Sequence, residues 1–305
     1  MSALNKVARA TISVLALALA AGATQVLAAE PAPAPAGQPQ SQQPVLRVCQ
    51  DPNNLPFSNR ALEGFENKIA VLLANELGWK IEYTFYPQRM GFIRNTLRSK
   101  NPESDTFKCD LVTGVPSGFD MGATTRPYYH STYAMAYVKG KGLDGVNSLE
   151  DLLALNAEQR AKLRLGVFGR SPVADWLLKH GLTEQMVSYQ TQSGDVERYP
   201  GEMVEKDLAN GVIDVAFIWG PIAGYFAQHS TAAVPIVAIP LKAQPGIKFD
   251  FEIAMAMRFG DAAYKQQIND AIDKQRPQIN AILQQYGVPL LDLPAGLTPP
   301  VAAVR

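Results

Sequence analysis

The stretch "VLRVCQDPNNLPFSNRALEGFENKIAVLLANELGWKIEYTF", residues 45–85, predicts a strand, a polar loop, a helix and a second strand in that order. Val45–Cys49 is mostly apolar, and a later run places apolar side chains on one helical face until Gly78 ends it. In Lys80–Tyr86, apolar and polar residues alternate as in a half-buried strand. A strand, a helix and another strand in succession predict a parallel pair joined by a covering helix.

The loop that leaves the first strand, "CQDPNNLPFSN" (Cys49–Asn59), is unusually polar and stiff. Such loops often carry function, and many are ordinary turns. Asp51 and Asn53 either contact a ligand or cap the following turn through its backbone. Because the loop follows a strand end, where ligands collect in α/β folds, we expect it to form one wall of a cleft.

The same alternation of strands and helices continues to the end of the chain, so the sequence predicts an α/β fold. A second α/β unit begins where Ser148 and Asp151 form a helix-capping signal. Ser171 and Pro172 predict another helix start. The further expected strands are 109–115, 132–138, 165–168, 187–190, 212–218, 236–239 and 251–257, and the expected helices are 91–99, 149–155, 172–179, 202–209, 221–228 and 261–286.

Residues 1–28 have the plan of a cleaved secretory signal peptide: a basic start, the apolar run Ile12–Ala20 and a small-residue end. The alternative, a membrane anchor, requires about 20 apolar residues, and this run is shorter. Residues 29–44 are a Pro/Ala/Gln-rich linker that cannot bury a core. We therefore expect an exported protein with no membrane span after signal removal.

The composition is that of a globular protein, with 47% hydrophobic and 18% charged residues. Lysine plus arginine and aspartate plus glutamate both number 28, and loss of Lys6 and Arg9 with the signal gives a net charge of −2. No basic stripe indicates nucleic-acid binding. The two cysteines, Cys49 and Cys109, lie at strand-like segments in a chain bound for an oxidising compartment, so they form either a disulfide or two buried thiols.

Several long segments resemble those of type II periplasmic solute-binding proteins. They include "GFENKIAVLLANELGWKIEY", "RPYYHSTYAMAYVKG", "LRLGVFGRSPVADWLL", "DLANGVIDVAFIWGPIAGYF" and "FEIAMAMR". The resemblance covers essentially the whole mature chain and implies two lobes, each with a mostly parallel sheet and flanking helices. It implies a first lobe made of 45–137 and 240–305, the latter including the C-terminal tail, with a second lobe, 138–239, inserted between them.

A narrower resemblance is to the MxaJ and XoxJ group of solute-binding-like proteins associated with quinoprotein alcohol dehydrogenases. It rests on "LRVCQDPNNLPFSN", "GFENKIA", "PQRMGFIRNTL", "CDLVTGVPSGFDMGATTRPYY" and "FIWGPIAGY". This resemblance implies a non-catalytic periplasmic accessory protein for a dehydrogenase that depends on pyrroloquinoline quinone (PQQ) and oxidises methanol or another alcohol. A lanthanide or calcium ion would belong to that partner, and no cofactor is expected in this chain.

Amino-acid receptors of the wider family hold the ligand carboxylate with an arginine after the third strand and the ammonium with a late acidic residue. The matching stretch here, Ser117–Gly122, contains no arginine, and the acidic position is occupied by Trp219. Losing one such buried charge pair costs several kcal/mol of affinity. A free amino acid is therefore a poor candidate ligand.

The side chains expected at the cleft are instead mostly aromatic or apolar, which suits an apolar ligand, a quinone-like ring or a protein segment. Phe65 and Tyr225 have an alternative interpretation as core residues, and Trp219 fits either role. Arg170 either binds an anion beside the helix start at Ser171 or is a solvated loop residue, and Arg126 is interpreted as a brace of the crossover. The full predicted set is Asp51, Asn53, Asn54, Leu55, Phe57, Phe65, Arg89, Pro116, Ser117, Phe119, Arg126, Tyr128, Arg170, Ser171, Trp219 and Tyr225.

Signals for catalysis or metal binding are weak. His130, His180 and His229 lack metal-ligand spacing, and "GVPSG" lacks the order of a nucleophile elbow. The prediction is therefore no catalytic residue, no metal site and no enzyme activity. Three functions are weighed: an accessory protein for a PQQ-dependent dehydrogenase, the solute receptor of an ABC importer for a small molecule that is not an amino acid, and, last, an enzyme such as a dehydratase.

Overall fold

The computed structural model describes residues 44–190, 195–230 and 233–293. The predicted signal peptide, nearly all of the linker and the end of the C-terminal tail lie outside the described residues. Within the described ranges, no helix combines the length and the apolar character that crossing a membrane requires.

The sheet of the first lobe has the strand order β4-β1-β5-β12. Strand β1 (Val45–Gln50) runs parallel to β4 (Lys80–Phe85) and to β5 (Leu111–Pro116), as the first stretch of sequence predicts. Strand β12 (Asp250–Met257) returns late in the chain and is antiparallel to β5. Three short strands complete this region: β2 (Asn53–Asn54), β3 (Ser58–Asn59) and β6 (Ala123–Thr124).

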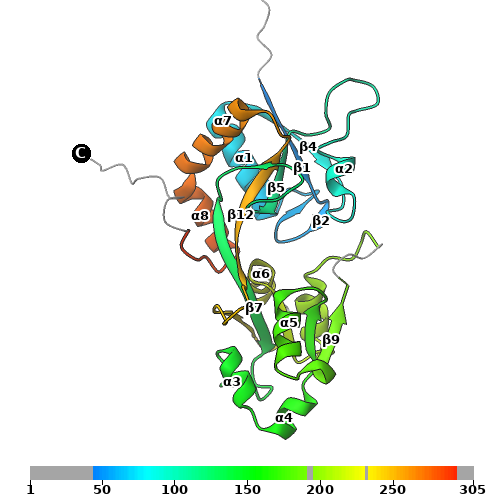
Figure 1. The fold of residues 1–305 in the computed structure, drawn as a ribbon, viewed down its shortest axis with the longest axis vertical. Coiled ribbons are helices and arrows are strands. Elements are labelled where there is room, and N and C mark those ends of the chain that lie inside the picture. Colours follow the sequence, from blue (N-terminus) through cyan, green and yellow to red (C-terminus); the bar gives the residue numbers. More distant parts are fainter. Residues whose placement is uncertain (1–43, 191–194, 231–232, 294–305) are drawn as a thin grey trace, which may run out of the picture. The chain divides into compact units, whose positions relative to one another are not determined.

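The long strand β7 (Tyr129–Val138) joins the two lobes (Figure 1). Its first half, from Tyr129 to Thr132, pairs with β12 of the first lobe. Its second half pairs with β10 (Val215–Trp219) and β11 (Ile236–Pro240) of the second lobe. One strand therefore belongs to both sheets, and it begins three residues earlier than the sequence predicts.

The second lobe repeats the parallel plan, with β10 beside β8 (Leu165–Phe168) and β8 beside β9 (Met186–Tyr189). Leu241 and Phe249 pack into the core of this lobe, and the chain re-enters the first lobe with β12. The predicted lobe boundaries at 138 and 240 stay predictions.

The helices of the second lobe are α3 (Leu149–Ala154), α4 (Ala157–Lys162), α5 (Pro172–Lys179), α6 (Gly220–Gln228), the 3-10 turn η1 (Thr183–Gln185) and the π-helix η2 (Met203–Leu208).

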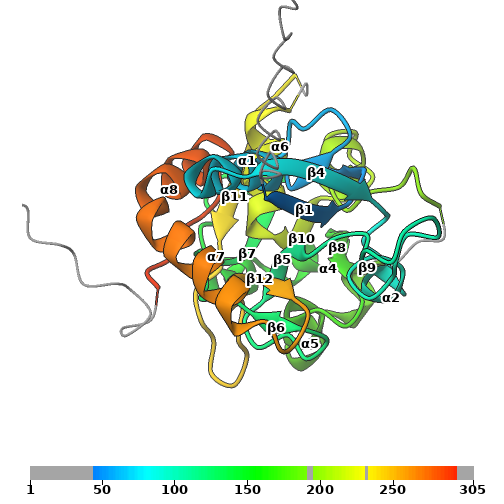
Figure 2. The same cartoon turned by 90° about the horizontal axis from the view of Figure 1, so that it is seen from above.

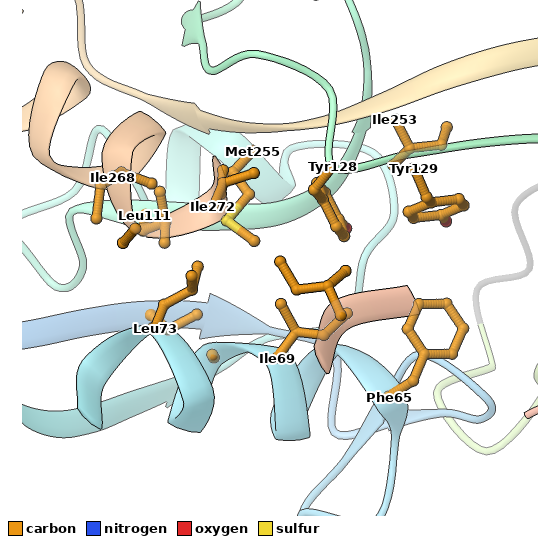
Figure 3. Close-up of a cluster of buried hydrophobic side chains, with 14 of the residues drawn as sticks. Phe65, Ile69, Leu73, Leu111, Tyr128, Tyr129, Ile253, Met255, Ile268 and Ile272 are labelled. Atoms are coloured by element: carbon orange, nitrogen blue, oxygen red, sulfur yellow. The ribbon is translucent and has the colours of Figure 1, made fainter. Parts of the chain in front are cut away.

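Helix α1 (Phe65–Leu77) carries the core of the first lobe. Phe65, Ile69 and Leu73 recur every four residues and point at the sheet, where all three are fully buried (Figure 3). Gly78 ends the helix in the left-handed region at φ 66°, a conformation that glycine adopts without steric cost. The helix α2 (Phe92–Asn95) is a short one beyond β4.

The expectation of one helix over 261–286 is wrong, because two helices occupy this segment. Helix α7 (Ala262–Lys274) ends before α8 (Arg276–Gln285) begins, and Pro277 lies in the first turn of α8. Proline has no N–H to donate to the carbonyl four residues back, so it starts a helix readily and interrupts one. Both helices pack beside α1, as Figure 2 shows from above.

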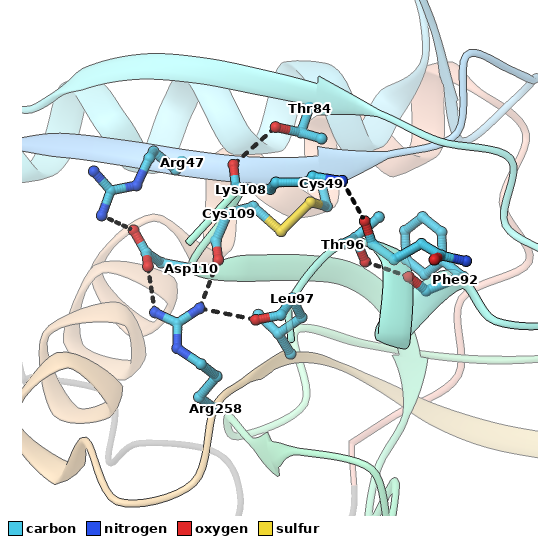
Figure 4. Close-up of a disulfide and its surroundings, with 11 residues drawn as sticks. Arg47, Cys49, Thr84, Phe92, Thr96, Leu97, Lys108, Cys109, Asp110 and Arg258 are labelled. Carbon is cyan, nitrogen blue, oxygen red and sulfur yellow. Dashed lines mark hydrogen bonds and ion pairs between the residues drawn. A yellow bond between two sulfur atoms is a disulfide. The ribbon is translucent and has the colours of Figure 1, made fainter. Parts of the chain in front are cut away.

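Cys49 and Cys109 form a disulfide that links β1 to the start of β5 (Figure 4). Asp110, next to it, pairs with Arg47 at 2.8 Å and with Arg258. Arg258 also donates to the carbonyl oxygens of Cys109 at 2.6 Å and Leu97 at 3.1 Å. A covalent bond and a charged network therefore tie the strands of the first lobe together.

Candidate functional site

Two cavities lie where the carboxyl ends of the strands of the two lobes approach each other. The outer cavity has a volume of about 460 Å³ and the inner cavity one of about 130 Å³. Both are lined by Asp51, Asn54 and Gln88 from the first lobe. The polar loop after β1 is thus a wall of both cavities.

Asp51 holds that loop in shape. Its Oδ1 accepts the backbone N–H of Asn53 at 2.8 Å, and its Oδ2 accepts that of Gln88 at 2.5 Å. The carboxylate is 7% exposed and is therefore largely satisfied by backbone donors. Asp51 therefore caps the turn that follows β1, and its contact with a ligand stays a prediction.

The same region of the first lobe touches the second lobe directly. The Asn53 side-chain amide donates to the carbonyl of Glu197 at 3.0 Å. Arg89 donates to the carbonyl of Arg198 at 2.7 Å. Leu55 and Phe57 pack against the apolar cluster that contains Ile218 and Phe226 of the second lobe. These contacts join the lobes on one side of the outer cavity.

Charged groups of the second lobe line the outer cavity. Arg198 pairs with Glu202, four residues further along the chain, at 2.7 Å, and the Tyr189 hydroxyl donates to Asp207 at 2.6 Å. Burial, and then the neighbouring Asp207 carboxylate, raise the pKa of Tyr189. The expectation of an apolar cleft is therefore wrong for this cavity, because its walls mix charged, polar and aromatic side chains.

Sequence reasoning missed these residues for a physical reason. Arg198, Glu202 and Asp207 occupy a polar segment with no strand-end signal, which is indistinguishable from a solvated surface before folding. Only the approach of the β1 loop places them beside a cavity. The cavity residues that the sequence did not indicate are Gln88, Phe168, Val187, Ser188, Tyr189, Gln190, Arg198, Tyr199, Pro200, Glu202, Met203, Asp207 and Val212.

Glu66, in the first turn of α1, lines the inner cavity and is 1% exposed. The Tyr128 hydroxyl donates to its Oε1. Burial raises the pKa of Glu66 to about 8 and outweighs the opposite effect of the Tyr128 and Thr113 hydroxyls. The carboxyl is therefore mostly protonated at neutral pH. An acidic residue in a first helical turn is common because of the helix dipole, so the sequence did not single it out.

Buried amides hold the start of α1 against the strand ends. Asn67 donates to Gln50 Oε1 at 2.6 Å, and Gln50 donates in turn to Thr113 Oγ1 at 3.2 Å. Asn67 Oδ1 accepts the N–H of Gly64 at 3.0 Å, at the N-terminus of the helix. This network fixes where Glu66 sits relative to β1 and β5, because buried polar groups are constrained by their few partners.

Trp219 is the contribution of the second lobe to the inner cavity. It is half-buried at the end of β10, and its ring centroid lies 5.4 Å from that of Tyr133 and 6.1 Å from that of Phe251. By the resemblance to amino-acid receptors, Trp219 occupies the position of their acidic residue. In this structure Trp219 forms part of the wall of the inner cavity. Its contact with a ligand or partner stays a prediction.

Three of the predicted aromatic residues that line neither cavity are Phe65, Tyr128 and Tyr225. Phe65 and Tyr128 are fully buried in the core of the first lobe, so neither can contact a ligand directly. Tyr225 stacks on Tyr286 at 5.7 Å and on His229 at 4.1 Å, over a separate surface hollow. The core interpretation describes Phe65, and the expectation of a cleft contact is corrected for all three.

The remaining predicted residues also lie outside the two cavities. Arg126 pairs with Asp273, and its backbone N–H donates to Asn269 at 2.7 Å, so it braces the crossover. Ser171 caps α5 by accepting the N–H of Ala174 at 3.3 Å. Arg170 is exposed, Pro116 and Ser117 are exposed at the end of β5, and Phe119 packs half-buried near the disulfide. Leu55 packs against the apolar cluster of the second lobe.

No group of three or more His, Cys, Asp or Glu side chains in the described ranges is arranged to hold a metal ion.

Comparison with known proteins found no matching family model. Among solved structures, the periplasmic binding protein XoxJ from Methylobacterium extorquens AM1 is 33% identical, with a TM-score of 0.64, over 81% of this chain and 100% of that one. The chain belongs to the XoxJ and MxaJ family of periplasmic binding proteins.

Other members of the XoxJ and MxaJ family agree over the same length. MxaJ from Methlophaga aminisulfidivorans MPT is 26% identical, with a TM-score of 0.66, over 81% of this chain and 100% of that one. Protein MoxJ of Methylorubrum extorquens AM1 is 26% identical over 255 residues, 81% of this chain and 82% of that protein. Membership of this family indicates a periplasmic or extracellular location.

Proposed function

We propose that this XoxJ/MxaJ family member is a non-catalytic periplasmic accessory protein that binds a PQQ-dependent methanol or alcohol dehydrogenase, of the lanthanide type, and assists its activation or maturation. The observation that carries the proposal is the similarity to XoxJ. The matched region covers 100% of the XoxJ chain and includes both lobes of this protein. Association with a quinoprotein dehydrogenase is what resemblance to this group implies, and the structure supports a binding role through the shape of its cleft.

The outer cavity is the surface that we assign to the partner. Its volume of about 460 Å³ is within the range of ligand clefts, and its walls come from both lobes. The lining of the outer cavity includes the aromatic residues Phe168, Tyr189 and Tyr199 and the charged residues Arg198 and Glu202. Aromatic and arginine side chains are enriched at protein interfaces, so a polar segment of a partner protein fits this surface.

The test measures stimulation of the cognate dehydrogenase by the purified mature protein. Trp219→Ala should weaken stimulation indirectly, because Trp219 lines the inner cavity, which shares the wall residues Asp51, Asn54 and Gln88 with the outer cavity. Trp79→Ala is the matched control: Trp79 stacks on Tyr264 at 5.9 Å in the first lobe and lines neither cavity. Full specific activity of the dehydrogenase in a clean deletion of this protein would contradict the proposal.

A second candidate function is the solute receptor of an ABC importer for a small molecule other than an amino acid. The inner cavity favours it, because a small space with buried polar walls resembles a ligand site. A thermal-shift screen separates the two functions, since a ligand at a hundred times its dissociation constant adds about 2.7 kcal/mol of stability. A strong shift with one metabolite and no effect on the dehydrogenase would favour the receptor.

A further inference from the structure

The inner cavity contains acceptor oxygens that nothing in the described structure satisfies. Glu66 Oε2 and Asn54 Oδ1 are buried, line the cavity and accept no hydrogen bond from the described residues. A buried acceptor without a donor is destabilising, so native proteins normally supply a partner from protein, water or ligand. Glu66 is 1% exposed, so its Oε2 atom, which has no hydrogen-bond partner, is buried in the protein and does not lie at the surface.

The ionisable side chains of the inner cavity are acidic. Asp51 and Glu66 line it, Glu66 is mostly protonated at neutral pH and ionises when it pairs with a cation, and no lysine, arginine or histidine is among the described residues that line it. Both carboxylate oxygens of Asp51 are already engaged by backbone N–H groups, whereas Glu66 has one oxygen bonded by Tyr128 and one open. A ligand that carries donors and positive charge is therefore favoured over an anion.

Part of the wall is aromatic. Among the residues that line the inner cavity are Phe57, Phe92, Tyr129 and Trp219. Aromatic rings attract cations through their negative faces and also accommodate a hydrocarbon group. The volume of about 130 Å³ has room for a molecule of only a few non-hydrogen atoms.

We propose that the inner cavity is a binding site for a small primary ammonium cation, such as ammonium or methylammonium, whose N–H groups donate to Glu66 Oε2 and Asn54 Oδ1 while the aromatic wall encloses the rest. A bare metal ion fits less well, because both carboxylate oxygens of Asp51 accept backbone N–H groups and aromatic side chains form part of the wall. The proposal concerns the isolated protein and does not depend on the proposed dehydrogenase partner.

Binding of a cation should displace a proton from Glu66. The groups that face this carboxyl are Tyr128 and Tyr129 from β7 and its approach, and Asp51 from the loop after β1. Burial raises the pKa of Glu66 to about 8, and burial also raises those of Tyr128 and Tyr129, so both phenols stay neutral. Glu66 must therefore release its proton to solvent in order to pair with the cation.

The test is isothermal titration calorimetry of the mature protein with methylammonium chloride, with sodium chloride as the ionic-strength control. We expect saturable binding that is roughly tenfold or more tighter than that of methanol, a neutral molecule of nearly the same size. Repeating the titration near neutral pH in two buffers of different ionisation enthalpy should reveal release of about one proton per site. Equal affinity for methanol, tighter binding of calcium, or no binding of methylammonium would overturn the proposal.

Three variants test whether methylammonium binding and proton release occur at the inner cavity. Glu66→Gln should weaken methylammonium binding by roughly tenfold or more and abolish proton release. Glu76→Gln, at the other end of the same helix and paired with Lys274, is the charge-matched control and should leave both unchanged. Asn54→Ala should weaken binding several-fold and keep proton release. If Glu66→Gln does not fold, unchanged binding by Asn54→Ala overturns the proposal by itself.

Discussion

The two lobes share a plan of parallel strands and covering helices, and they are held together by different means. The first lobe has the Cys49–Cys109 disulfide, the Asp110 ion network and a fully buried acid, Glu66. The second lobe depends on apolar packing around Trp176 and Phe217, with its ion pairs at the surface. The disulfide and the ion network thus occur in the first lobe, which is also the lobe that holds the buried polar side chains around Glu66. Buried polar groups are tolerated only in a defined geometry, so a rigid surrounding structure suits them.

The largest expected effect is the loss of the disulfide. Cys49→Ala combined with Cys109→Ala removes a cross-link between residues 60 apart, which by chain entropy lowers the free energy of unfolding by about 4 kcal/mol. Urea unfolding followed by circular dichroism measures this loss. Hydrogen exchange should accelerate in β1 and β5 and stay nearly unchanged in β8. Equal acceleration in both lobes would show that the lobes do not differ in this respect.

The next effect comes from Glu66 and appears as a dependence on pH. Burial raises the pKa of this carboxyl from its ordinary value of 4.5 to about 8, so the folded state keeps a proton that the unfolded chain releases. Its stabilising contribution is therefore present at low pH and is lost as the pH rises toward 8. Between roughly pH 5 and pH 8, the wild type should lose on the order of 3 kcal/mol more unfolding free energy than Glu66→Gln. Parallel stability curves for the two proteins would contradict this prediction.

The smallest effect belongs to the surface ion pair of the second lobe. Arg164 pairs with Asp214 at 2.8 Å, with side-chain exposures of 48% and 31%, so Arg164→Ala should cost less than about 1 kcal/mol of unfolding free energy. Arg258→Ala is the contrasting variant in the first lobe. It removes two bonds to backbone carbonyls as well as the pairing with Asp110, and should cost about 2 kcal/mol. Similar losses for both arginines would remove the distinction between the lobes.

Elements with strong local signals could be predicted closely from the sequence. Helix α5 spans Pro172–Lys179 as predicted, because Ser171 caps it and Pro172 suits its first turn. The end of α1 at Gly78 is likewise a local property. Pro277 is also a local signal, but the prediction of one helix from 261 to 286 took no account of it, and the segment forms two helices.

The site was predicted less completely, and the misses share a cause. The loop residues Asp51, Asn53 and Asn54 follow a strand end, a position that places them at a cleft in this class of fold. Arg198 and Glu202 line the same cavity, but their surroundings in sequence are those of an exposed segment. Phe65 and Tyr128 carry aromatic rings near the same strand ends, and the rings point into the core. Which side of an element faces a partner depends on residues distant in the chain.

The sequence by itself determined the order of strands and helices and their local ends, because these follow from periodicity, capping and turn chemistry within short windows. The two-lobed α/β family was implied by the resemblance of long segments to known proteins. Only the tertiary structure decided that Cys49 meets Cys109, that Glu66 is buried with an open oxygen, and that charged residues of the second lobe face the β1 loop. The physical reason is that burial, and with it the pKa and the hydrogen-bonding needs of a side chain, is set by groups that come together only on folding.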